Sequence, residues 1–315
     1  MRQNFYFFCL LMITSLAYSQ ETIKVHRFVG GLESYESNAF WLEGPQHLVL
    51  IDSLMLKADA EQLVAAMKTA KKPLAGIIIT HPHLDHFGGI RTVLAGFGSV
   101  PVIATQATAS AMPIIHEQAL SSWAKALGDR YETNLFVPNQ LTKSGETLEI
   151  GGLKFRIHDY GPMESENNSV VENLDLKVLF TGDATVAHAP YYVGEGHIDG
   201  AQAGLERLTR DFPPEMLCFS GHYAPLPLGQ LVKMNLAEIH SAVQLVEDHL
   251  HQQQVTKNED LTRELQLEMV ERIQNLYDAR TTFSYGLSNR TMAMINLPGL
   301  IQWVMNQKSK NIPGQ

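Results

Sequence analysis

A short segment after an apolar run carries four potential metal ligands, and it constrains the fold more than any other part of the chain. Residues 75–80 are apolar enough to predict a buried strand. His81, His83, Asp85 and His86 follow, and then two glycines. His81 and His83 point the same way in an extended segment, so they can hold one cation. Asp85 and His86, at the start of a following helix, can hold a second.

Between residues 23 and 227, short apolar runs alternate with helical patterns. Strands are predicted at 24–28, 38–42, 47–51, 75–80, 100–104, 153–158, 169–172, 178–181 and 216–220. Helices are predicted at 57–71, 107–127 and 201–210. An opening meander followed by alternating strands and helices predicts a layered α/β sandwich.

The pattern changes after residue 227. Residues 229–253 and 260–280 have helical spacing, and one last apolar helix is expected at 300–305. We therefore divide the chain into a signal peptide at 1–19, a sandwich domain at 20–228 and a C-terminal helical region at 229–315.

The first residues have the pattern of a secretory signal peptide. Arg2 precedes an apolar stretch at 5–16, and the small residues Ala17 and Ser19 form a cleavage pattern. The apolar stretch is too short to span a membrane. We therefore expect cleavage after Ser19, no membrane span in the mature chain, and a periplasmic or secreted protein.

Composition limits the partners and the chemistry. The net charge is −9 and no block of lysine or arginine occurs, which excludes binding to a nucleic acid through its phosphates and favours a small-molecule substrate. Only Cys9 and Cys218 are present, whereas there are 13 histidines. A metal site must therefore use imidazole and carboxylate ligands.

The spacing HxHxDHxGG resembles the signature of the metallo-β-lactamase superfamily. That resemblance implies an αββα sandwich with two metals at one edge of the paired sheets. It also implies that Asp183, at a strand end, is the carboxylate shared by both metals, and that His222 is the last imidazole ligand.

One ligand departs from the common pattern. Where members usually carry Gly-x-x-His, this chain has Glu164 three residues after Gly161. A carboxylate is an acceptable zinc ligand, so His81, His83 and Glu164 would form one face of the first site. Glu166, His158 and His188 are the alternatives for this position.

A glutamate 19 residues before the shared carboxylate also resembles the alkylsulfatase branch of the superfamily. The resemblance is partial, because residues 191–204 contain neither arginine nor lysine to hold a sulfate. The helical tail resembles the dimer-forming helices of that branch, which implies a homodimer through the C-terminal helices.

This ligand set implies two zinc ions per chain, with manganese or iron as alternatives. A metal-bridging hydroxide would attack an ester, lactone, amide or sulfate ester, with Asp85 and Asp183 in catalytic roles. A β-lactamase or an alkylsulfatase is the more specific alternative, and a metal-bound, non-hydrolytic binding protein is the alternative from another class.

Substrate selection would depend on side chains near the metals. His188, Tyr191 and Tyr223 lie close in sequence to Asp183 and His222. We therefore expect these three residues to bind the substrate.

Overall fold

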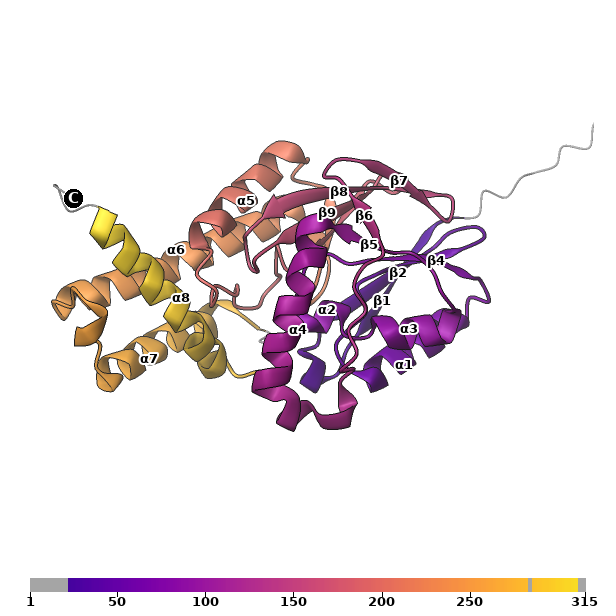
Figure 1. Ribbon diagram of the computed structural model, residues 1–315. Helices are drawn as coiled ribbons and strands as arrows, with labels where there is room; N and C mark the ends of the chain where they lie inside the picture. The colour runs from indigo at the N-terminus through magenta and orange to yellow at the C-terminus, as the bar shows by residue number, and fades with distance from the viewer. Residues whose placement is uncertain (1–21, 283–284, 311–315) are drawn as a thin grey trace, which may run out of the picture.

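Two mixed sheets form the centre of the computed structural model, which describes residues 22–282 and 285–310 (Figure 1). The first is six-stranded in the order β1-β2-β3-β4-β5-β6. Its strands are β1 Lys24–Val29, β2 Asn38–Glu43, β3 Leu48–Ile51, β4 Leu74–Ile78, β5 Val102–Thr105 and β6 Gln140–Thr142. The second is six-stranded in the order β12-β11-β10-β9-β8-β7. Its strands are β7 Thr147–Ile150, β8 Leu153–Gly161, β9 Asn168–Asn173, β10 Val178–Gly182, β11 Leu217–Ser220 and β12 Leu226–Pro227.

Helices cover the outer face of each sheet. The helices on the first sheet are α1 Lys57–Lys68, α2 Leu84–Phe87, α3 Ile90–Phe97 and α4 Gln106–Leu127. Those on the second are α5 Ile198–Asp211 and α6 Leu228–Gln252, while α7 Arg263–Arg280 and α8 Asn289–Lys310 pack against α6 and against each other in the same apolar cluster. The predicted αββα sandwich with C-terminal helices is therefore confirmed.

The buried strand β3 shows why this fold needs continuous apolar runs. Leu48 and Leu50 pack in the cluster shared with the helices, whereas Val49 and Ile51 pack between the two sheets. Because successive side chains of a strand point to opposite faces, both faces of β3 must be apolar.

Several elements differ from the sequence prediction. The strands β6, β7 and β12 were not predicted, because each is too short for periodicity to distinguish it from a loop. The helix expected at Asp85 and His86 is two short helices, α2 and α3. The last helix begins at Asn289 rather than near residue 300, so Pro298 lies inside it.

The helix α8 lies so close to residues 193–196 that only a glycine fits at position 299. An added Cβ there would lie 2.0 Å from the carbonyl oxygen of Val193.

The C-terminal helices hold the β10–α5 loop, residues 183–197, by its backbone. Asn235 of α6 pairs with both the N–H and the C=O of Val186, at 3.0 and 2.7 Å. Asn296 of α8 accepts from the N–H of Val193 and donates to the C=O of Tyr191, both at 2.9 Å. These buried amides replace the hydrogen bonds that an irregular segment cannot make to itself.

One apolar cluster contains residues from both sides of the predicted boundary at 228, including Leu179 of β10, Leu205 of α5, Val246 of α6 and Leu300 of α8. The division into a sandwich and a helical region stays a prediction, as does a homodimer through these helices. The predicted signal peptide lies outside the described residues. Within residues 22–282 and 285–310, no helix combines the length and apolar character that a membrane span requires.

Glu238 of α6 generates a prediction about stability. Its Oε1 accepts from the N–H of Tyr191 at 2.6 Å, and burial raises the pKa of its carboxyl from 4.5 to about 8. The folded protein therefore keeps a proton that the unfolded chain loses above pH 4.5, so this group makes the free energy of unfolding fall as pH rises towards 8. Glu238→Gln cannot ionise and should escape that loss.

Urea unfolding of both proteins at pH 5, 6.5 and 8 checks this. The difference in free energy of unfolding between variant and parent should shift in favour of the variant by up to about 1.4 kcal/mol per pH unit. A difference that stays constant across this range would contradict the assignment of the buried carboxyl.

Candidate metal centre

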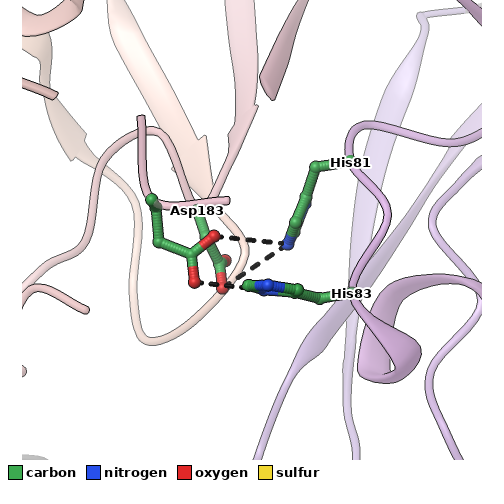
Figure 2. A group of neighbouring side chains, drawn as sticks. His81, His83 and Asp183 are labelled. Carbon is green, nitrogen blue, oxygen red and sulfur yellow. Dashed lines mark ion pairs between the residues drawn. The ribbon is translucent and has the colours of Figure 1, made fainter. Parts of the chain in front are cut away.

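Four strand ends bring the predicted ligands to one edge of the sandwich. His81 and His83 follow β4, Asp183 follows β10, and His222 follows β11. Glu164 lies in the turn between β8 and β9. Figure 2 shows His81 and His83 directed at Asp183 across the gap between the two sheets. The predicted residues therefore converge, although they come from distant parts of the chain.

The first group of facing side chains is His81, His83, Glu164 and Asp183. Nε2 of His81 lies 3.8 Å from Oε2 of Glu164 and 3.8 Å from Oδ2 of Asp183. Nδ1 of His83 lies 3.1 Å from Oε1 of Glu164. Each residue offers one ligand atom, and these atoms lie within 4.8 Å of one another, which is the spacing of atoms around a single ion.

The second group is Asp85, His86 and His222. Oδ2 of Asp85 lies 3.3 Å from Nε2 of both imidazoles. All three side chains are buried.

Asp183 faces both groups with the same oxygen. Its Oδ2 lies 3.8 Å from Nε2 of His81, 3.5 Å from Nε2 of His86 and 3.3 Å from Nε2 of His222. The backbone makes room for it at Gly221, where an added Cβ would lie 1.9 Å from Oδ1 of Asp183. This is the position that a carboxylate shared by two cations requires.

Asp52, directly after β3, fixes the orientation of His86. Its Oδ2 lies 3.0 Å from Nδ1 of His86 and accepts from the Thr80 hydroxyl at 2.8 Å, while Oδ1 accepts from the Thr80 N–H at 2.9 Å. A positive φ of 58° at Asp52 aims the side chain at this position. With its oxygens already engaged, Asp52 acts as a positioning residue and leaves Nε2 of His86 for a cation.

Glu195 fixes the orientation of His83 in the way that Asp52 fixes that of His86. Its Oε1 lies 3.0 Å from Nε2 of His83, which leaves Nδ1 facing Glu164. No pattern in the sequence pointed to this glutamate, because it lies in an irregular loop 112 residues from its partner.

The cluster contains buried polar atoms that lack a hydrogen-bond partner among the described residues. They are Nε2 of His81, Nε2 of His86, Oε2 of Glu164 and Oδ1 of Asp183. Leaving such atoms unpaired costs about 1–3 kcal/mol each, more for charged groups. Bound cations would satisfy these atoms, so the residues fit a metal centre.

The ionisation of the site agrees with that fit. Burial opposes the charge on Asp183, but His222 and His86 outweigh it and hold the pKa of this carboxyl well below its usual range. Burial likewise opposes the charge on Glu164 and raises its pKa to about 7, despite the proximity of His83. Neighbouring groups thus offset the cost of burying a negative charge less fully at Glu164 than at Asp183. A bound cation would offset the remaining cost at Glu164.

The geometry separates Glu164 from the alternatives for the first site. Its carboxylate is 5% exposed and faces both His81 and His83. Glu166 points outward and pairs with His197, and His158 pairs with Glu172 on the second sheet. His188 instead packs edge-on against Tyr223.

A cavity of about 390 Å³ opens onto the cluster, and its lining differs from the set of residues expected to bind the substrate. His188, Tyr191 and Tyr223 are absent from its walls. Tyr191 is 1% exposed, and its hydroxyl donates to the C=O of Ala184, because the loop turns this side chain into the core. The neighbouring Tyr192 lines the cavity instead, together with Tyr35 and Tyr285.

Comparison with known proteins agrees with the site. Residues 34–222 match the sequence model of the Metallo-beta-lactamase superfamily. The chain is 25% identical over 164 residues to a hydroxyacylglutathione hydrolase of Bdellovibrio bacteriovorus, covering 52% of this chain and 55% of the relative. It is 32% identical over 111 residues to an (R)-specific secondary-alkylsulfatase of a Pseudomonas species, covering 32% of this chain and 16% of the relative. The chain thus matches about half or less of the length of these relatives.

A solved structure extends the likeness to the C-terminal helices. A metallo-β-lactamase family protein from Thermus thermophilus aligns over 90% of this chain and 94% of its own, with a TM-score of 0.62 and 18% identity. At this identity the similarity concerns the fold alone.

Asp52→Asn tests the positioning of His86. The amide would present a donor where two donors already point, so His86 should lose its fixed orientation and metal affinity should fall by about 10- to 100-fold. Competition with a chelator, followed by metal analysis, measures this. Glu43→Gln is the matched control, because Glu43 pairs with His26 at 2.9 Å outside the cluster. Unchanged affinity in Asp52→Asn, or an equal loss in the control, would contradict the role of Asp52.

Proposed function

Because the chain belongs to the metallo-β-lactamase superfamily, we propose that it is a dinuclear metal-dependent hydrolase acting on carboxylic esters, including lactones. The superfamily and the relatives already indicate a metal-dependent hydrolase. The position of Asp183 carries the finer proposal, since one carboxylate oxygen faces His81 on one side and His86 and His222 on the other.

When bound, two divalent cations would supply a hydroxide nucleophile at neutral pH and would polarise the bond to be cleaved. Zinc is the metal we propose, because imidazole and carboxylate are ligands that it accepts readily. The protein's own contribution is to hold the ligands in place. Asp85 would orient the nucleophile and accept its proton at Oδ2, while Asp52 and Glu195 keep His86 and His83 aimed at the cluster.

A sulfate ester is the second candidate. Two observations favour it: the match to a secondary-alkylsulfatase and the glutamate at position 164. The cavity lining weighs against it, because neither lysine nor arginine is among the described residues of its wall. A sulfate would therefore lack a guanidinium partner from the protein.

Metal content and activity of two variants test the dinuclear proposal. The purified protein should contain close to two metals per chain. Asp183→Ala should lose both metals and lower ester hydrolysis by about a thousandfold or more, because several kcal/mol of charge stabilisation disappear. Glu164→Ala should lose one metal, and Glu164→His should retain two.

Near-zero metal in a folded protein purified from zinc-supplemented medium would refute the dinuclear proposal. Unchanged metal content in Glu164→Ala would remove Glu164 from the ligand set. Equal effects of the two alanine variants would show that Asp183 is not shared.

We also propose that the protein acts outside the cytoplasm, on the basis of residues 1–19 alone. Expression in a Gram-negative host should yield periplasmic or extracellular protein whose N-terminus, measured by mass spectrometry, lies near Gln20. An intact Met1 confined to the cytoplasmic fraction would contradict secretion.

A further inference from the structure

The cavity at the metal cluster has one polar end and one apolar end. Its polar lining consists of Glu195 and five residues of the cluster, namely His83, Asp85, Glu164, Asp183 and His222. Its apolar walls come from two helices: Ile115 and Ala119 on α4, and Met292 and Ile295 on α8, with Leu287 just before α8. In Figure 1 the start of α8 lies beside α4, so the C-terminal helical region forms one wall of the candidate active site.

The charges around the cavity favour a neutral ligand. Its described lining includes the carboxylates of Asp85, Glu164, Asp183 and Glu195 and the imidazoles of His83 and His222, but no lysine or arginine. The remaining polar side chains that α4 contributes are the uncharged Gln118 and Ser122. Bound cations would offset Asp85, Glu164 and Asp183 at the cluster. Farther along the walls from α4 and α8, however, no described lysine or arginine lines the cavity to pair with an anionic group.

On each helix an exposed apolar side chain stands next in sequence to a wall residue. Ile295 is 38% exposed although it lines the wall, and the adjacent Met294 is 54% exposed. On the opposite helix, Ile114 beside Ile115 is 58% exposed.

From these observations we infer that the space between α4 and α8 binds the apolar acyl chain of a neutral carboxylic ester, with the ester group at the metal cluster. This inference rests on the proposed function and narrows its substrate class. The cavity volume of about 390 Å³ lies within the range typical of small-molecule sites, roughly 300–1,000 Å³. Hydrophobic burial of the chain would supply the binding energy, since the walls offer few hydrogen bonds.

A series of p-nitrophenyl esters from acetate to decanoate tests the inference with the metal-loaded protein. kcat/KM should rise about fourfold for each added methylene until the chain fills the cavity, as transfer of a methylene from water predicts. An equal kcat/KM for acetate and decanoate would overturn the inference while leaving ester hydrolysis, and so the proposed function, intact.

Each helix offers a matched pair of variants. Ile115→Glu and Ile295→Glu place a carboxylate on the wall, and each should lower kcat/KM for decanoate at least tenfold more than for acetate. Ile114→Glu and Met294→Glu place the same charge one residue away, on side chains that do not line the cavity, and should keep the chain-length dependence. Equal losses in wall and control variants would overturn the assignment.

Calorimetry with 2-nonanone, a neutral ketone that cannot be hydrolysed, supplies a measurement independent of turnover. It should bind at least tenfold more tightly than 2-butanone, and the wall variants alone should lose that preference. Octyl sulfate should bind at least tenfold more weakly than 2-nonanone, whereas equal or tighter binding would overturn the preference for a neutral ligand. If no ester is hydrolysed, the proposed function fails, but the ketone measurement still decides whether the space between α4 and α8 binds an apolar chain.

Discussion

The carboxylate of Asp183 is the interaction on which the rest of the site depends. It is buried among His81, His86 and His222, and one of its oxygens faces all three imidazoles. Such a position is possible only because β10 and β11 are parallel neighbours, so that their ends meet at the same edge of the sheet. Gly221 adds the necessary space, since any side chain there would collide with the carboxylate. The position of the Asp183 carboxylate in the cluster therefore depends directly on the pairing of β10 with β11.

The sequence motif pointed to His81, His83, Asp85 and His86, and the family resemblance pointed to Asp183 and His222. The apolar runs of β4, β10 and β11 predicted strands, and His81, Asp183 and His222 follow them closely. The residues that orient the ligands could not be located in this way. Asp52 meets His86 across 34 positions of sequence, and Glu195 meets His83 across 112. Such contacts depend on tertiary packing, and a lone carboxylate in a turn or loop carries no periodicity that would distinguish it.

The position of Tyr191 in the core has an equally physical cause. Adjacent tyrosines in an irregular loop offer no pattern that tells which one faces the cavity. The structure selects Tyr192, because Glu238 and Asn296 bind the N–H and the C=O of Tyr191 and hold its ring in the core. Apolar spacing predicted helices in the C-terminal region, but it could not show that the buried side chains of Glu238 and Asn296 bind the backbone of this loop.

Through these hydrogen bonds the C-terminal helices act on both the cavity wall and the cluster by way of one loop, residues 183–197. Asn296 holds Val193 and Tyr191, which flank Tyr192 in the cavity wall, and Glu195 follows two residues after Val193. Glu195 in turn fixes His83 at the cluster. On the same helix, Met292 and Ile295 form the apolar wall one turn before and directly beside Asn296. A displacement of α8 would therefore move the apolar cavity wall and His83 together, so the C-terminal region contributes directly to the candidate site.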